Sequence, residues 1–279
     1  MKQLLLPLLA MLAVGCDQQP AGEPVTRTRI DGQEGPATPA PDPSATVTSQ
    51  VESACRSVIF ENTPLTHCLA IPARHTIGTA LAGSDGANYR SLQALSGASD
   101  AGTIAFAMNG GMFDDAGDPI GYFVEDSERL HALNTADGEG NFHMNPNGVF
   151  YGTGDSWEIR TTEDFLANVT DRPEFGTQSG PMLVIDGKLH PEITQDGPSR
   201  YVRNAVGIDD RGRAHFVISN APISFGKLAR FYRDELGAPN ALYLDGNVSA
   251  LWNPATERLD SGAPLGPLIV VAKRATAPE

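Results

Sequence analysis

The stretch ALYLDGNVSALW, residues 241–252, shows most clearly how this chain folds. Four residues of strand character, from Ala241 to Leu244, run into an Asp-Gly turn, a pair that favours reversal of the backbone. Upstream, Ser224 is a candidate N-cap and Gly237 stands where a glycine ends a helix. Between these two residues apolar side chains recur at helical spacing, namely Phe225, Leu228, Ala229, Tyr232 and Leu236. The sequence therefore predicts a helix, a loop, a buried strand and a polar turn.

Asp245 is the candidate catalytic residue of this turn. A carboxylate at the end of a buried strand is held rigidly by the sheet and can still face a cleft. Three further residues of the turn, Gly246, Asn247 and Ser249, are candidate substrate contacts. The alternative is an ordinary Asp-Gly turn without a function.

A second strand ends in the same way. The apolar run 103–108 is typical of a strand covered on both faces, and it leads directly into Asn109, Gly110 and Gly111. Two glycines at this point allow left-handed backbone angles or the close approach of a ligand, and Asn109 supplies an amide. The alternative is a tight turn.

Two further segments provide candidate binding residues. Gln178, Ser179 and Gly180 form a polar turn before an apolar strand. Arg203 and Asn204 stand at the entrance to the strand 205–208, and a guanidinium group binds phosphate oxygens bidentately. In an acidic chain Arg203 is therefore the best candidate anion site, with a surface salt bridge as the alternative.

The connections between these segments predict the fold class. Hairpin turns dominate, for example at 186–187 and 209–212, and short helices are predicted only near 91–95, 161–168 and 224–237. Helices are too few for regular β-α-β alternation. We therefore expect an α+β fold, a single domain of twisted, mostly antiparallel sheets with a few packed helices, closed by a last strand at 268–272.

The N-terminal segment is expected to lie outside this domain. Lys2 precedes an apolar run that ends at Gly15-Cys16, which indicates a signal peptide over residues 1–15 and resembles a bacterial lipobox with Cys16 as the lipidated residue. The alternative is a plain secretory signal with a chance cysteine. Residues 16–50 are rich in Pro, Ala and Thr and predict a disordered tether, so the domain occupies residues 51–274. We expect a protein of the bacterial cell envelope, exported and anchored to a membrane by lipid.

Composition restricts the partners and the metal chemistry. The chain has 34 acidic residues against 20 Lys and Arg, a net charge of -14, which argues against nucleic acid as a partner. If Cys16 is lipidated, Cys55 and Cys68 remain as a pair, and in an exported protein a pair of cysteines on a predicted hairpin favours a disulfide. The six histidines are scattered and no metalloprotease, phosphate-loop or nucleophile-elbow motif is present, so we expect neither a metal nor a cofactor.

Several of these segments together resemble one known family. The segments are AMNGGMF, GYFVEDSERLHALN, GNFHMNPNGVF, TQSGPMLVIDGKLHP, SRYVRNAVGIDDRGR and LYLDGNVSALW. In this order they resemble the phosphodiester glycosidase family, which includes the catalytic domain of the mammalian mannose 6-phosphate uncovering enzyme, and the resemblance extends from Cys55 to Ala272. The residues that match the family are Asn109, Gly110, Ser179, Gly180, Pro181, Arg203, Asp245 and Gly246. The chain departs from the uncovering enzyme at Asn247-Val248-Ser249, where that enzyme has further glycine.

The resemblance implies a hydrolase that cleaves the glycosidic bond of sugar-1-phosphodiesters in envelope or imported glycans. Such a site needs a cation for the phosphate, which is the role expected of Arg203, and a carboxylate beside the anomeric carbon, which is the role expected of Asp245. Hydrogen bonds to sugar and phosphate are expected from Asn109, Gln178, Ser179 and Asn204. Glu125 and His143 are reserve candidates for an acid or base, although His143 between Phe142 and Met144 also suits a structural role.

Two other functions stay open at this point. A non-catalytic lipoprotein that binds phosphorylated glycan needs Arg203 but not Asp245. A phosphodiesterase that cuts the phosphorus-oxygen bond acts on the same substrates and is distinguished by the fate of the water oxygen.

Overall fold

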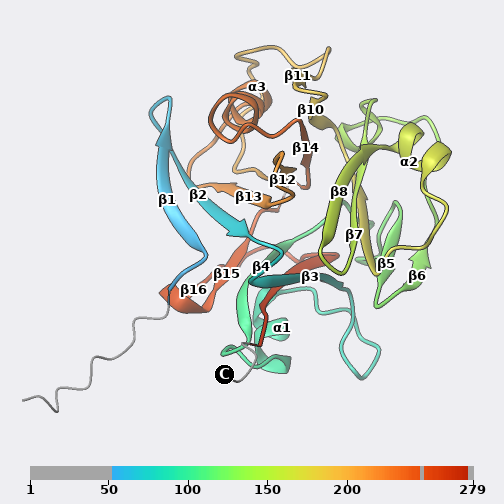
Figure 1. Cartoon of the computed structure of the whole chain (residues 1–279), viewed down its shortest axis with the longest axis vertical. Helices are drawn as coiled ribbons and strands as arrows, with labels where there is room; N and C mark the ends of the chain where they lie inside the picture. The colour runs from blue at the N-terminus through green and yellow to red at the C-terminus, as the bar shows by residue number, and fades with distance from the viewer. Residues whose placement is uncertain (1–51, 246–247, 276–279) are drawn as a thin grey trace, which may run out of the picture. The chain divides into compact units, whose positions relative to one another are not determined.

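The structure is a computed structural model that describes residues 52–245 and 248–275. Residues 50–279 form one compact unit that contains three antiparallel sheets and a few short helices (Figure 1). The expected α+β fold is therefore confirmed. The predicted signal peptide, Cys16 and the tether lie outside the described residues. Within residues 52–245 and 248–275, no helix is long and apolar enough to cross a membrane.

The first sheet has seven strands, one of which leads into Asp245. Its strands, in spatial order, are β1 (Cys55–Phe60), β2 (Thr63–Ala70), β13 (Ala214–Ser219), β12 (Asn204–Ile208), β14 (Asn240–Tyr243), β10 (Met182–Ile185) and β11 (Lys188–Leu189). The disulfide between Cys55 and Cys68 joins β1 to β2 at directly paired positions, so the predicted disulfide is confirmed.

The other two sheets have five strands each. The second sheet consists of β16 (Arg258–Leu259), β15 (Leu251–Asn253), β4 (Ile104–Asn109), β17 (Leu268–Lys273) and β3 (His75–Ala80). The third sheet consists of β6 (Glu128–His131), β5 (Phe123–Glu125), β9 (Phe175–Ser179), β7 (Gly148–Thr153) and β8 (Ser156–Thr161). The apolar run before Asn109 is β4, and all six of its residues are buried, as the continuous apolar pattern predicted.

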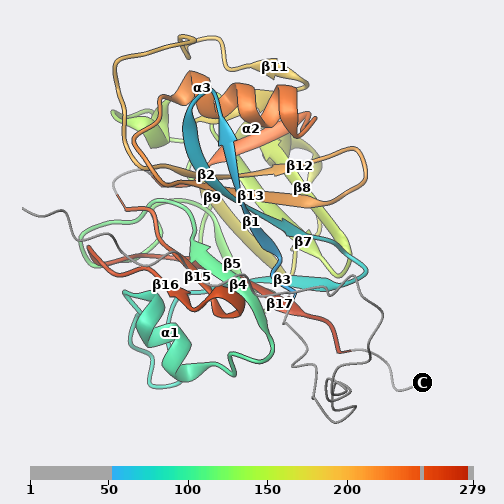
Figure 2. The same ribbon diagram turned by 90° about the vertical axis from the view of Figure 1, so that its left-hand side faces the viewer.

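Each sheet carries one α-helix on its outer face. Helix α1 (Leu92–Ala98) packs on the second sheet and α3 (Phe225–Arg230) on the first (Figure 2). Helix α2 (Thr162–Asn168) packs on the third sheet (Figure 1). Helix α3 continues as a π-helical turn, η2 (Phe231–Glu235). Each α-helix begins with a hydroxyl cap: the side chains of Ser91, Thr161 and Ser224 accept hydrogen bonds from backbone N–H groups in the first turn. The three helices predicted from sequence are therefore confirmed.

The inner faces of the three sheets share one hydrophobic core. Phe216 of the first sheet contacts Phe106 of the second at 5.3 Å between ring centroids and Phe150 of the third at 5.8 Å. All three side chains are fully buried, and both contacts have the edge-to-face geometry that aromatic rings prefer. This shared core holds the three sheets against one another. Polar residues lie at the ends of several of their strands.

Candidate active site

Strand ends from all three sheets meet at one point. Asn109 ends β4 of the second sheet, Ser179 ends β9 of the third, and Asn204 begins β12 of the first. Asp245 follows β14 of the first sheet after Leu244. These four candidate residues, which lie far apart in the sequence, are all buried.

Asn204 links three of these segments through its side-chain amide. Its Nδ2 donates to the backbone carbonyl of Asn109 at 2.9 Å and to Oδ1 of Asn109 at 3.0 Å. Its Oδ1 accepts from the backbone N–H of Asp245 at 3.1 Å and from the hydroxyl of Ser249 at 3.3 Å. The Asn204 side chain thus ties β4 to the turn that carries Asp245.

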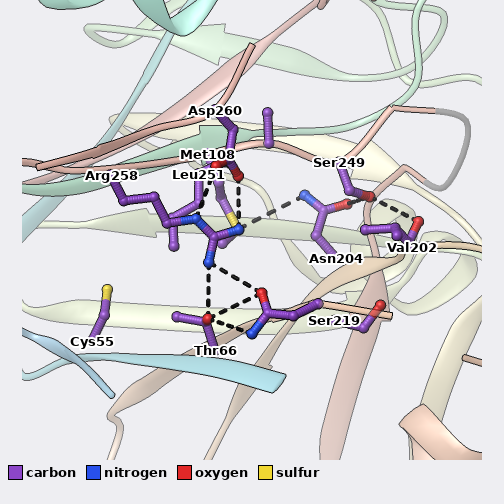
Figure 3. Close-up of polar contacts among 12 residues, drawn as sticks. Cys55, Thr66, Met108, Val202, Asn204, Ser219, Ser249, Leu251, Arg258 and Asp260 are labelled. Atoms are coloured by element: carbon purple, nitrogen blue, oxygen red, sulfur yellow. Dashed lines mark hydrogen bonds and ion pairs between the residues drawn. The ribbon is translucent and has the colours of Figure 1, made fainter. Parts of the chain in front are cut away.

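Two serine hydroxyl groups also hydrogen-bond to the segment that carries Asp245. The Ser179 hydroxyl donates to the carbonyl of Leu244, directly before Asp245. The Ser249 hydroxyl lies near Oδ1 of Asn204 and 3.2 Å from the carbonyl of Val202 (Figure 3). It also lies 2.9 Å from the carbonyl of Asp245. A hydroxyl can donate only one of these bonds at a time, so three acceptors compete for the Ser249 proton. Gly246 and Asn247 lie outside the described residues.

Asp245 lines a cleft of about 620 Å³, a volume within the usual range of small-molecule sites. Its walls are formed by the loop 112–120, by the segment 139–143 with the 3-10 turn η1 (Asn141–His143), and by Asp245 and Val248. The described lining residues include four carboxylates, Asp114, Asp115, Glu139 and Asp245. The first three are exposed at the mouth, whereas Asp245 is only 6 % exposed.

Arg90 is the one lysine or arginine among the described lining residues of this cleft. Its guanidinium lies over the ring of Phe113, 5.3 Å from the centroid, and its Nη1 is buried without a hydrogen-bond partner among the described residues. The sequence analysis missed Arg90. Its one local signal is a left-handed backbone, φ 55°, which is uncommon outside glycine and becomes visible only in the structure.

Arg203 lies on the other side of the first sheet, under α3, and is 1 % exposed. Its Nε donates to the carbonyl of Ile223 at 3.0 Å, its Nη1 to the hydroxyl of Tyr243 at 2.9 Å, and its Nη2 to the Ser199 hydroxyl at 2.9 Å. Its guanidinium also lies over the ring of Phe225 at 3.7 Å. Arg203 is thus held by its own protein and is not among the described residues that line the cleft.

Tyr243 connects Arg203 electrostatically with Asp245. Burial is the main cause that raises the pKa of Tyr243, the charge of Arg203 opposes this rise, and the charge of Asp245 adds to it. The charges of Arg203 and Asp245 therefore act on the Tyr243 hydroxyl in opposite directions.

Gln178 and the glycines serve as scaffold. Gln178 Oε1 accepts from the backbone of Tyr122 at 2.8 Å, and its Nε2 donates to the carbonyl of Asn134 at 2.7 Å. Gly111 packs against β9, where a Cβ would clash with the carbonyl of Gln178 and lie 2.7 Å from the Thr177 hydroxyl. Gly110 lies against the backbone of Pro267, and a Cβ on Gly180 would lie 2.7 Å from Asn147. These glycines permit the close approach of protein segments.

The two reserve candidates lie in different places. His143 lines the cleft, and its Nδ1 lies 2.9 Å from the carbonyl of Ala136. Because a carbonyl only accepts, Nδ1 carries the proton and Nε2 is the atom left for a substrate. Glu125 lies outside the described lining and accepts from the backbone N–H of Leu81 at 3.0 Å. Burial raises the pKa of Glu125, and that hydrogen bond opposes the rise.

A buried histidine pair lies in the first sheet. Nε2 of His67 on β2 is 3.0 Å from Nδ1 of His215 on β13, and Nε2 of His215 is 3.1 Å from the carboxylate of Asp209. Burial, followed by the charge of His215, lowers the pKa of His67 to about 3. Burial also lowers the pKa of His215, so both histidines are neutral at physiological pH. Among the described residues, no group of three or more His, Cys, Asp or Glu side chains is arranged to hold a metal ion.

Comparisons with known proteins place this geometry in a family. Residues 102–271 match the sequence profile described as phosphodiester glycosidase. The uncharacterized protein YigE of Escherichia coli strain K12 is 38 % identical over 151 residues, which are 54 % of this chain and 59 % of that protein, so the chain spans about three fifths of this relative.

One solved structure shares the fold, and a second aligns more weakly. The catalytic domain of zebrafish N-acetylglucosamine-1-phosphodiester α-N-acetylglucosaminidase, auto-inhibited by pro-peptide, aligns with a TM-score of 0.55 and 14 % identity over 79 % of this chain and 82 % of that one. A hypothetical protein from Synechocystis aligns with a TM-score of 0.49 and 16 % identity over 79 % of this chain and 61 % of that one. The profile match, which includes the strands that carry Asn109, Ser179, Asn204 and Asp245, shows that the chain belongs to the phosphodiester glycosidase family.

Proposed function

We propose that this protein hydrolyses the glycosidic bond of sugar-1-phosphodiesters in envelope or imported glycans and releases a free sugar and a phosphate monoester. The observation that carries the proposal is the placement of Asp245, which lines the cleft at the point where strand ends of three sheets meet. Family membership and the name of the zebrafish enzyme, which acts on an N-acetylglucosamine-1-phosphodiester, support the substrate class.

The bond decides which groups the site needs. Its leaving group is a phosphate monoester with a second pKa of roughly 6, so protonation assists departure less than it does for an alcohol. Catalysis instead needs a carboxylate beside the oxocarbenium-like carbon and a cation beside the phosphate, because each stabilises the charge of the group next to it. We assign the first role to Asp245, as the nucleophile or as the base that activates water. His143 is the candidate base of the cleft through its unprotonated Nε2, and it can act as an acid there only when both ring nitrogens carry a proton.

The phosphate requires a cation, and Arg90 is in the better position to supply it. Arg90 lines the cleft, whereas Arg203 is not among the described lining residues and donates to Ile223, Tyr243 and Ser199. We assign Arg203 a positioning role through Tyr243. Asn109 and Asn204, which are hydrogen-bonded to each other, and Ser179, which donates to the carbonyl of Leu244, hold the Asp245 turn. Gln178 holds the backbone of Tyr122 and Asn134 through its side-chain amide.

The lipid anchor at Cys16 and a location in the cell envelope belong to the same proposal. A tether of residues 16–50 would let the domain reach envelope polymers while it stays at the membrane. Metabolic labelling with a fatty-acid probe tests the anchor, and Cys16→Ser is expected to abolish the label.

Product analysis in heavy-oxygen water tests the reaction. We expect wild-type protein, incubated with a panel of sugar-1-phosphodiesters, to release reducing sugar that carries the heavy oxygen. Heavy oxygen in the phosphate instead would show cleavage of the phosphorus-oxygen bond and make the protein a phosphodiesterase. Binding without any turnover across the panel would favour a non-catalytic glycan-binding lipoprotein. Arg90→Gln is expected to raise KM for the phosphodiester, and an unchanged KM would remove Arg90 from the phosphate site.

A further inference from the structure

A second groove adjoins the cleft, and the two share Val248. This side groove has a volume of about 320 Å³, at the lower end of the range for small-molecule sites. One wall is Tyr201 and Val202, a second is the segment Val248–Ala250 that follows Asp245, and a third is the loop 260–265. The side groove is thus built partly from the turn that carries the candidate catalytic residue.

Tyr201 presents an exposed aromatic surface in the side groove. It is 55 % exposed and the neighbouring Val202 is 39 % exposed, and both belong to the small set of large apolar residues that are exposed in the described chain. The backbone of Tyr201 exchanges two hydrogen bonds with Ile223, at 3.3 and 2.8 Å. The guanidinium of Arg203 lies over the Tyr201 ring at 5.4 Å from its centroid. The ring is therefore held in place before any ligand binds, which lowers the entropy lost on binding.

The charge of the side groove differs from that of the cleft. Asp260 is the one charged residue among its described lining residues, and Arg258 pairs with both of its oxygens, at 2.9 and 2.8 Å (Figure 3). The rest of the polar rim is uncharged, with hydroxyl and amide groups from Ser91, Gln93 and Ser261. An aromatic platform with a neutral hydrogen-bonding rim suits a ligand that has an apolar face and many hydroxyl groups. It suits a phosphate poorly.

We infer that the side groove binds an uncharged saccharide unit of the substrate, beyond the sugar that is bonded to the phosphate. Its connection to the substrate rests on the proposed function. The Val248 carbonyl accepts from Nδ2 of Asn109 at 2.7 Å, and Ser249 bonds to the carbonyls of Asp245 and Val202. A saccharide on Tyr201 therefore lies against the same turn that positions Asp245. The preferred substrate is an oligosaccharide or polymer and not a single sugar phosphodiester.

Saccharide binding to the full chain tests this inference without relying on turnover. The probes are cellobiose, maltose and N,N′-diacetylchitobiose, measured by saturation-transfer NMR and titration calorimetry. We expect at least one disaccharide to bind, Tyr201→Ala to weaken it roughly three- to tenfold, and Tyr201→Phe to stay within about twofold of wild type. Ala263→Trp, which fills the groove from an exposed position, is expected to abolish binding. Leu166→Ala, at a residue of α2 that is 64 % exposed, is the matched control and leaves binding unchanged.

Each other outcome overturns the inference. If the wild type binds no disaccharide, the groove is not a saccharide site. The same conclusion follows if Tyr201→Ala and Ala263→Trp bind the disaccharide as tightly as the wild type does. Binding of hexyl phosphate in place of the disaccharides would assign the groove to an apolar aglycone. The two proposals fail separately, because disaccharide binding without hydrolysis of any sugar-1-phosphodiester defeats the enzyme proposal alone, and hydrolysis without disaccharide binding defeats the groove alone.

Discussion

The Asn204 side chain offers the sharpest single-atom test of the site. Asn204→Asp replaces Nδ2 by oxygen and leaves the size of the side chain unchanged. The remaining oxygen can still accept from Asp245 and Ser249, but the two bonds that Nδ2 donates to Asn109 are lost. The new oxygen faces two acceptors at 2.9 and 3.0 Å in a fully buried position. The variant should therefore lose stability by an amount that depends on its protonation.

The size of the effect follows from these contacts. When the introduced carboxyl is protonated, it can donate one hydrogen bond. One of the two Asn109 acceptors then has no donor, which lowers the free energy of unfolding by about 1–3 kcal/mol. Burial and the facing acceptors raise the pKa of the new carboxyl above about 3.9, its value in the unfolded chain. The protonated carboxyl therefore makes its full contribution to the free energy of unfolding below pH 4. As pH rises from there toward the folded-state pKa, the variant loses about 1.4 kcal/mol of that free energy per pH unit. Between pH 5 and pH 7 the deficit should grow by as much as about 2.7 kcal/mol, the value reached when the folded-state pKa of the new carboxyl lies above 7.

Urea unfolding of the variant and the wild type at pH 5 and pH 7 measures this deficit. Asn62→Asp is the matched control, because Asn62 is exposed in a turn with φ 60°, a conformation that both Asn and Asp tolerate. This control should stay within about 0.5 kcal/mol of the wild type at both pH values. An Asn204→Asp deficit below about 0.5 kcal/mol, or one that does not change with pH, would refute the hydrogen-bond network described for the site.

Three further predictions address stability and electrostatics. The folded-state pKa of His67, about 3, lies below its unfolded value, so the unfolded chain binds more protons than the folded chain as pH falls. This histidine should therefore lower the free energy of unfolding by about 2 kcal/mol between pH 7 and pH 5, and urea titrations of His67→Gln should lack that part of the pH dependence. Gly111→Ala should lower the free energy of unfolding by at least about 1–3 kcal/mol in thermal scans, because the new Cβ would overlap β9. Gly97→Ala in α1 is the control: there is open space around its Cβ, so its free energy of unfolding should stay the same or rise. Asp115→Asn at the mouth of the cleft should raise kcat/KM for an anionic phosphodiester about threefold at low salt and not at about 0.5 M salt; equal effects at both salt concentrations would contradict an electrostatic origin.

The sequence predicted the local elements well because their signals are local. The strand before Asp245, the fully buried β4, the capped helices and the disulfide hairpin all follow from periodicity, caps and cysteine pairing. The order of the strands could not be predicted in this way. For example, the last strand β17 lies between β4 and β3, and only packing between distant segments decides that position.

The site was predicted in part, and the arginines show why. Arg203 and Asn204 are neighbours at the start of β12, and successive side chains of a strand point to opposite faces. Asn204 therefore faces β4 and the Asp245 turn, whereas Arg203 faces α3. Arg90 lies outside the residues that match the family, and only the fold brings it to the cleft of Asp245.

The measurement that tests the central claim most directly compares turnover and substrate binding for the wild type and Asp245→Asn, with Asp115→Asn as the control at another carboxylate of the same cleft. The account predicts that Asp245→Asn lowers kcat for a sugar-1-phosphodiester by at least about 10³-fold and leaves binding within a few-fold, while Asp115→Asn keeps its turnover. Wild-type turnover by Asp245→Asn, in a protein that hydrolyses the substrate, would contradict the assignment of Asp245 as the reacting carboxylate.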